Sequence, residues 1–260
     1  MTILRRGPRS RRGGNSMFGL HYKLERKAIT LVLAIIGVAS IGGIVEIAPL
    51  FTIDQTVEEA PDMRVLTPLE LTGRNIYIRE GCNACHSQMI RTLRDEVERY
   101  GPYSRAAESQ YDHPMLWGSK RTGPDLARVG GKYSDAWHAA HLANPRDLVP
   151  QSVMPAYPWL SRRQARIDDL GRHLRALQTL GVPYTEAMIE NAEADAYGQA
   201  APNSERGWGV SERYGETANV RDFDGRPGAP TEMDALIAYL QMLGRQTAIA
   251  QASTGAGEGP

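Results

Sequence analysis

The sequence predicts an all-α protein that consists of one N-terminal transmembrane helix followed by a helical domain. Three observations support this fold class. A long apolar run lies near the N-terminus, capped segments with helical spacing lie at both ends of the remaining chain, and no alternating strand and helix pattern precedes the only cysteine pair. The length of 260 residues suits one domain with appendages.

The apolar run covers residues 28–53 and predicts the transmembrane helix. Glu46 is its only charged residue, and about 20 apolar residues suffice to cross a bilayer core. A cleaved signal peptide would have a shorter apolar region, and "APLFTIDQ" is a poor cleavage site. We therefore expect an uncleaved anchor in contact with membrane lipid, in which Ala39 and Gly43 allow a partner helix to approach closely.

The charge distribution predicts the orientation of this anchor. Residues 1–27 carry a net charge of +7, from eight Lys or Arg side chains against Glu25, although the formal charge of the whole chain is zero. Basic residues before the span place the N-terminus in the cytoplasm and the rest of the chain outside it. Nucleic-acid binding is not expected, because the positive charge lies outside the folded domain.

The first helix of the domain is predicted from its N-terminal cap. Thr67 is a capping residue, Pro68 occupies the first helical position, and Glu70 completes a capping box. The helix should end at Gly81, directly before the cysteines.

The stretch "REGCNACHSQM" contains Cys82, Cys85 and His86, and its spacing predicts covalent attachment of haem. A zinc site would need a fourth ligand that no second motif supplies, and a redox dithiol would follow a strand of a βαβ unit. Two thiols at this spacing can add to the two haem vinyl groups, which leaves the next histidine beneath the iron. We expect one haem c, attached through both cysteines and ligated by His86.

A methionine as sixth ligand would be typical of an electron carrier. Met154 in "PQSVMPAYPWL" is the best candidate, because prolines stiffen its loop. Met89 is too close to the motif, whereas Met233 and Met242 have the spacing of core residues in the last helix. His113 in "YDHPML" is the chief rival.

The last helix is predicted between its cap Thr231 and the stop signal Gly244. It should cross the first helix of the domain, so that Gly73 and Tyr77 meet Leu236 and Tyr239. Two further helices are predicted at residues 161–180 and 185–197, and residues 198–230 are expected to form a solvated loop.

Four stretches together resemble the mono-haem cytochrome c subunit (subunit II) of C-family, cbb(3)-type haem-copper oxidases. They are "YIREGCNACHSQMIR", "ERYGPYS", "YDHPMLWGSKRTGPDLARVGGKYSD" and "MPAYPWL", and the resemblance covers about residues 24–184 and 231–244. It implies a class I cytochrome c domain in which His86 and Met154 are the axial ligands. It also implies that the carbonyl of Pro124, within "TGPDL", accepts the other N–H of the proximal histidine.

The resemblance also implies a function and partners. The chain would relay electrons from a further cytochrome c subunit to the catalytic haem-copper subunit, which reduces dioxygen to water in aerobic respiration. It would have no catalytic centre of its own, and its haem domain would lie on the periplasmic side of the bacterial inner membrane. A nitric-oxide reductase subunit and a free-standing anchored shuttle are the alternatives.

These inferences divide the chain into segments. We expect a basic cytoplasmic head, an anchor, a linker, a cytochrome c domain in two parts with a helical insertion and loop between them, and a flexible tail. The boundaries are 1–27 for the head, 28–53 for the anchor, 54–66 for the linker, 67–160 and 231–244 for the cytochrome c domain, 161–230 for the insertion, and 245–260 for the tail.

Overall fold

The computed structural model describes residues 21–22, 25–52, 63–226 and 228–246. It divides into two compact units on either side of residues 57 and 58. The described residues form helices, turns and an isolated β-bridge between Gln164 and Thr231, which confirms the all-α fold class. Most of the predicted basic head, most of the linker and most of the C-terminal tail lie outside the described residues.

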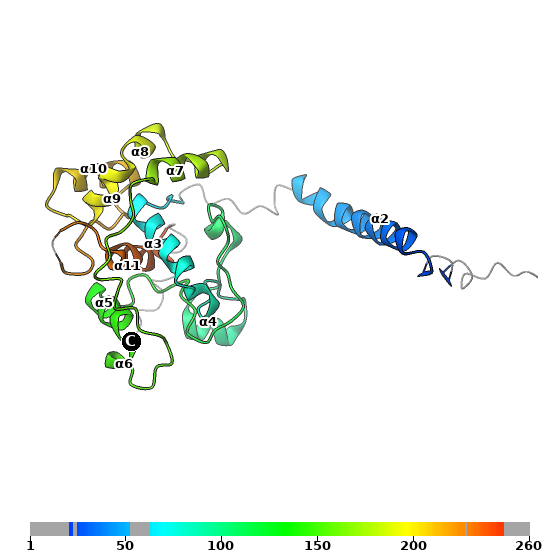
Figure 1. Ribbon diagram of the computed structural model, residues 1–260, viewed down its shortest axis with the longest axis horizontal. Helices are drawn as coiled ribbons and strands as arrows, with labels where there is room; N and C mark the ends of the chain where they lie inside the picture. Colours follow the sequence, from blue (N-terminus) through cyan, green and yellow to red (C-terminus); the bar gives the residue numbers. More distant parts are fainter. Residues whose placement is uncertain (1–20, 23–24, 53–62, 227, 247–260) are drawn as a thin grey trace, which may run out of the picture. The chain divides into compact units, whose positions relative to one another are not determined.

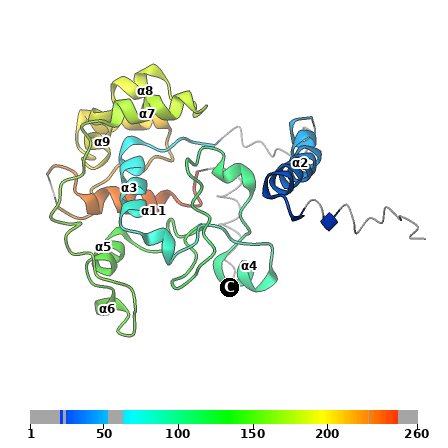
Figure 2. The same cartoon turned by 45° about the vertical axis from the view of Figure 1, so that its right-hand side comes forward.

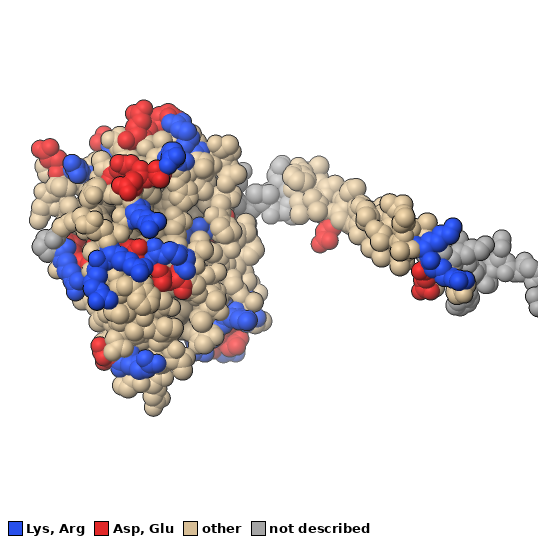
Figure 3. All heavy atoms as spheres, viewed as in Figure 1, with Lys and Arg blue, Asp and Glu red and all other residues tan. Residues whose placement is uncertain are grey.

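The first unit contains the apolar helix α2 (Ala28–Ile47), which continues into the 3₁₀ turn η1 (Ala48–Phe51). Together they span 24 residues and are long and apolar enough to cross a membrane. No side chain of α2 is buried, and in the view of Figure 3 charged groups appear only near its two ends. This single apolar helix fits the predicted anchor.

The second unit is built around two crossing helices, α3 (Pro68–Arg79) and α11 (Glu232–Met242) (Figures 1 and 2). The predicted capping box begins α3, since the Thr67 hydroxyl and the Glu70 carboxylate each accept the other residue's backbone N–H. The buried Glu70 also accepts two hydrogen bonds from Arg64, at 2.8 and 2.9 Å. These bonds fix the start of α3 and therefore the position of the motif at its end.

Close backbone contact joins the two helices. A Cβ atom at Gly73 would lie 1.9 Å from the carbonyl oxygen of Ala235, so only glycine fits this position. The rings of Tyr77 and Tyr239 pack with centroids 5.6 Å apart. The predicted crossing is confirmed, but the nearest neighbours of Gly73 are Ala235 and Tyr239 rather than the predicted Leu236.

Shorter helices surround this pair. The part that follows the cysteine motif contributes α4 (Arg94–Tyr100), η4 (Ala106–Ser109), α5 (Asp135–Ala143) and α6 (Pro145–Leu148). The inserted part contributes α7 (Leu170–Thr179), α8 (Glu186–Glu190), α9 (Ala192–Gln199) and α10 (Glu205–Tyr214).

The helix predicted for residues 161–180 begins only at Leu170. The preceding backbone is instead paired with the start of α11. Ala165 N–H donates to the Pro230 carbonyl, and the N–H groups of Glu232 and Met233 donate to Arg163 and Leu160. Because these groups are used in tertiary pairing, they cannot form helical hydrogen bonds.

The helix predicted for residues 185–197 is divided at Asn191 into α8 and α9. The solvated loop predicted for residues 198–230 is also wrong for the described part of that stretch. It contains α10, whose Val210 is fully buried, and it places Phe223 in the core with 1% exposure. The inserted part is therefore packed against the domain and shares its apolar core.

Candidate haem site

The cysteine motif directly follows the C-terminal end of α3. Gly81 adopts a left-handed conformation (φ 74°), after which Cys82–Ala84 form the 3₁₀ turn η3. The N–H groups of Cys85 and His86 both donate to the Cys82 carbonyl, at 3.1 and 2.9 Å. Both thiols and the imidazole therefore belong to one hydrogen-bonded turn, as attachment across the edge of a haem requires.

The turn does not suit redox chemistry of the thiols themselves. Burial, with a smaller contribution from the nearby charge of Glu80, raises the pKa of the Cys82 thiol to about 11. Catalytic dithiols depend on a lowered thiol pKa, because the thiolate is the reactive form. This environment argues against a thioredoxin-like role.

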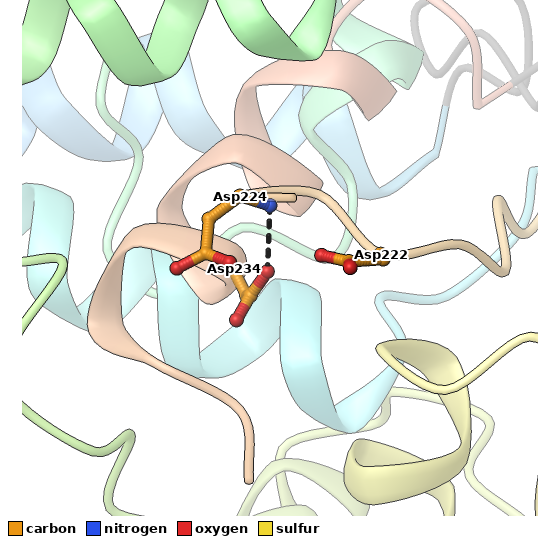
Figure 4. Close-up of side chains that lie close together, drawn as sticks. All are labelled: Asp222, Asp224 and Asp234. Atoms are coloured by element: carbon orange, nitrogen blue, oxygen red, sulfur yellow. Dashed lines mark hydrogen bonds between the residues drawn. The ribbon is translucent and has the colours of Figure 1, made fainter. Parts of the chain in front are cut away.

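A zinc site is not formed there either. Asp222, Asp224 and Asp234 are the group of side chains in the described part of the chain that could hold a metal ion together (Figure 4). Their ligand atoms all lie within 4.8 Å of one another. Asp234 accepts the Asp224 N–H at 2.9 Å, so these carboxylates brace the loop before α11. The cysteines and His86 are not part of this cluster.

His86 is oriented by the backbone of residues 123 and 124. Its Nδ1 lies 2.8 Å from the Pro124 carbonyl oxygen, an atom that can only accept a hydrogen bond. Nδ1 therefore carries the hydrogen, which leaves the lone pair of Nε2 for a metal. Gly123 makes this approach possible, because a Cβ there would lie 2.2 Å from His86 Cε1. Gly123 lies within the quoted "TGPDL", but its need for a glycine arises from His86, 37 positions earlier, and no local pattern reveals it.

Met154 lies in the loop after α6 and packs, half-buried, against the apolar core. The loop is tied to α5, since Tyr157 N–H donates to the Leu142 carbonyl at 2.8 Å. Burial raises the pKa of the Tyr157 hydroxyl, and the nearby thiols of Cys82 and Cys85 raise it further. Tyr157, three residues after Met154, therefore lies near the two cysteines.

His113, the rival ligand, is placed elsewhere. Its carbonyl accepts a hydrogen bond from Arg74 at 3.1 Å, and it lines a small cavity with Leu71 and Leu177. These contacts hold His113 against the first half and the middle of α3. The cysteines, in contrast, follow the C-terminal end of α3. Met115 is more than half exposed, as expected of a surface residue rather than an internal ligand.

Three buried ring nitrogens lack hydrogen-bond partners within the described chain: Nε2 of His138, Nδ1 of His141 and Nε1 of Trp159. A buried polar group without a partner is costly, so such atoms suit a bound group with polar substituents. The ring of Trp137 stacks on His141 and on Tyr133, at centroid distances of 4.6 and 4.0 Å. Unpartnered nitrogens of this kind fit a bound group that can form hydrogen bonds with them.

Arg128, a basic residue of the quoted "GPDLARVGG" region, is engaged elsewhere. Its guanidinium makes two hydrogen bonds to Glu108, at 2.6 and 2.8 Å, and it is almost fully buried. Its two terminal nitrogens are therefore committed to Glu108, whereas its buried Nε lacks a partner.

The comparison with protein families agrees with this geometry. The family model described as cytochrome C oxidase, mono-heme subunit/FixO matches residues 21–247, which is most of the chain and includes α2 and the whole second unit up to α11. None of the curated proteins compared with the chain gives a significant match. The chain therefore belongs to the FixO family and is a membrane-anchored, mono-haem cytochrome c subunit of a cbb(3)-type cytochrome c oxidase.

Proposed function

We propose that Cys82 and Cys85 hold one haem c covalently and that His86 and Met154 are its axial ligands. The observation that carries this proposal is the 2.8 Å hydrogen bond from His86 to Pro124, made by an imidazole in the same turn as both thiols. This bond fixes the tautomer and ring orientation that metal ligation requires. Met154 is supported by its loop, which is anchored to α5 beside the cysteines.

Each of these residues has a distinct task. When bound, the haem supplies a reversible one-electron change at its iron. The cysteines keep it attached, Pro124 increases the basicity of His86 as a ligand, and Met154 closes the sixth position to small molecules. The chain needs no nucleophile or general base for this task.

The role that follows is electron relay within the oxidase complex. The chain would receive electrons from a further cytochrome c subunit or donor and pass them to the catalytic haem-copper subunit, which reduces dioxygen to water. The anchor α2 would keep the haem domain beside that subunit. The basic residues before α2 support a cytoplasmic N-terminus, with the haem domain in the periplasm of the bacterial inner membrane.

The test is a reduced-minus-oxidised spectrum of the complex purified through the tagged chain in mild detergent, together with a copper assay. We expect haem b, haem c and copper, and a band of this chain that keeps its haem after denaturation. The matched control is the same chain with Cys82→Ser and Cys85→Ser, whose band should carry no haem. Haem b with non-haem iron and no copper would contradict the oxidase assignment, and a haem-free band from the unaltered chain would contradict attachment itself.

A further inference from the structure

We propose that Arg121, Asp125, Glu96 and Ser87 form a positioning unit that holds the Pro124 carbonyl on His86 and thereby sets the reduction potential of the haem. The inference rests on the proposed function of His86 as a haem ligand. None of these four residues would touch the haem iron, so they act through the bond between His86 and Pro124.

Two chain segments meet at this bond, residues 85–89 and residues 121–126. On one side of the bond, Gly123 N–H donates to the Cys85 carbonyl at 3.0 Å. On the other side, Leu126 N–H donates to the Ser87 carbonyl at 2.9 Å. The contact between His86 and Pro124 therefore lies between two backbone hydrogen bonds, and its length depends on how firmly the segments are held together.

Asp125 provides the first clamp between the segments. One of its carboxylate oxygens, Oδ2, accepts hydrogen bonds from the Ser87 hydroxyl at 2.6 Å and from Met89 N–H at 3.0 Å. The other oxygen accepts the Ala127 N–H at 2.8 Å. Asp125 is buried, so these bonds are shielded from competition with water. Its neighbour in sequence is Pro124, whose carbonyl is fixed by the same clamp.

Arg121 provides the second clamp. Its Nε donates to the Ser87 hydroxyl at 2.8 Å, and its Nη2 donates to the Met89 carbonyl at 2.8 Å. The guanidinium also forms an ion pair with the buried Glu96 at 2.7 Å, which holds it in place from α4. Only the planar, five-donor fork of arginine can serve these partners together.

The clamp has a direct consequence for the iron ligand. A short hydrogen bond donated by Nδ1–H to the carbonyl makes the imidazole a more basic ligand, which stabilises the ferric state and lowers the reduction potential. If the segments separate, this bond lengthens and the potential should rise. Two arginines, Arg91 and Arg121, are paired here with two carboxylates, Glu96 and Asp125, so the cluster carries no net charge. A substitution that conserves charge keeps it neutral and therefore tests only the geometry of the hydrogen bonds.

The decisive variant is Arg121→Lys in the full-length, haem-loaded chain, because lysine keeps the charge but lacks the fork. The matched control is Arg213→Lys. Arg213 pairs with the buried Asp195 in the inserted part, and its side chain is 22% exposed, close to the 19% of Arg121. Both variants lose a fork from a buried carboxylate, but only Arg121 connects to the His86 segment. Ser87→Ala is a second, uncharged test in case Arg121→Lys fails to fold.

The readouts are the midpoint potential of the haem and the exchange rate of the His86 Nδ1 proton. For Arg121→Lys we expect a potential shift upward that corresponds to roughly a tenfold change in the reduction equilibrium, about 59 mV, and faster proton exchange. Ser87→Ala should shift both readouts in the same direction by less. Arg213→Lys should lower the unfolding temperature and leave both readouts unchanged.

The outcomes separate this inference from the proposed function. If Arg121→Lys and Ser87→Ala keep the potential and exchange rate of the unaltered chain, the four residues are structural only and the inference is overturned. It is also overturned if Arg213→Lys shifts the potential equally, since the effect would then be general loosening. If the unaltered chain carries no covalent haem, the proposed function fails first, and the inference falls with it.

Discussion

The cysteine turn and the inserted part, residues 161–230, use the same physical interactions in different ways. Around His86, a backbone carbonyl and buried carboxylates position one imidazole, and glycine at residue 123 lets the His86 ring approach the backbone. In the inserted part, the buried pair of Asp195 and Arg213 and the close approach at Gly198 join α9 to α10. Similar buried networks would therefore position the ligand of the proposed haem in one region and pack two helices together in the other.

The largest effect should come from removing the thiols. Cys82→Ser with Cys85→Ser should abolish covalent haem, because no thioether bond can form. The inserted part makes no use of these thiols, so its protection from limited proteolysis should change less than that of the cysteine turn. Haem staining after denaturing electrophoresis measures the first effect. Covalent haem in the double variant would show that the cysteine turn does not attach it.

Replacement of Met154 by alanine should leave the haem attached, lower its potential and let carbon monoxide bind the ferrous iron, because the sixth position is opened. Optical titration and carbon monoxide difference spectra measure these changes. Met188→Ala is the control, since Met188 lies in α8 of the inserted part and packs at the edge of the core. A methionine-ligated spectrum that survives Met154→Ala would show that another residue is the sixth ligand.

Two glycines allow a paired test of packing. Gly73→Ala would force a Cβ to within 1.9 Å of the Ala235 carbonyl, so we expect a loss of about 3 kcal/mol in unfolding free energy together with less haem attachment. Gly198→Ala, whose Cβ would lie 2.5 Å from the Arg206 backbone, should cost about 1–3 kcal/mol. It should loosen α10 and leave haem attachment unchanged.

Gly37→Ala is the control for this pair, because Gly37 lies in α2 and a Cβ there meets no atom within 4 Å. Denaturant unfolding and the ratio of haem to protein are the measurements. Equal loss of attached haem in the Gly73 and Gly198 variants would remove the distinction between the two regions.

The smallest effect concerns pH. Arg121 in the first place, and Arg91 after it, hold the pKa of the Glu96 carboxyl far below its usual value near 4.5. A lowered pKa in the folded state means that Glu96 stabilises the fold above its unfolded pKa, and that this contribution is lost as the pH falls below about 4.5. Glu96→Gln should therefore lower the unfolding temperature near neutral pH. The unfolding temperature of this variant should also fall less steeply as the pH is lowered.

The control for the pH series is Glu98→Gln on the same helix. Glu98 pairs with Arg94 on the surface, where an ion pair contributes little. Thermal unfolding followed between pH 7 and pH 3 measures both variants. If the unfolding temperature of Glu96→Gln falls as steeply below pH 4.5 as that of the unaltered chain, other carboxyl groups determine the loss of stability in acid.

Local signals made part of this structure predictable from sequence. The capping box at Thr67 and the stop at Gly81 gave α3 its bounds, and Thr231 and Gly244 did the same for α11. The spacing of Cys82, Cys85 and His86 predicts an attached haem, and the structure places all three residues in one turn. In each of these cases, residues within a few positions of one another decide the conformation, so the pattern carries the information.

Other parts depend on partners far along the chain, and the sequence pattern misled there. The apolar spacing from residue 161 onward predicts a helix, but the backbone near Arg163 pairs with residues 230–233. The polar composition of residues 198–230 hid α10, although Ser204 caps it and accepts the Gly207 N–H. The clamp of Ser87 by Asp125 joins residues 38 positions apart, a relation that no local pattern contains.

The partner of His86 has a consequence for how this subunit can vary. The acceptor at residue 124 is a main-chain carbonyl, which every amino acid possesses, so no single substitution can delete it. A substitution can weaken the contact only by moving the loop or the ring, as a Cβ at Gly123 would do, 2.2 Å from His86 Cε1. The acceptor itself thus persists through any change of side chain at residue 124, while its distance from the imidazole stays open to selection at neighbouring positions.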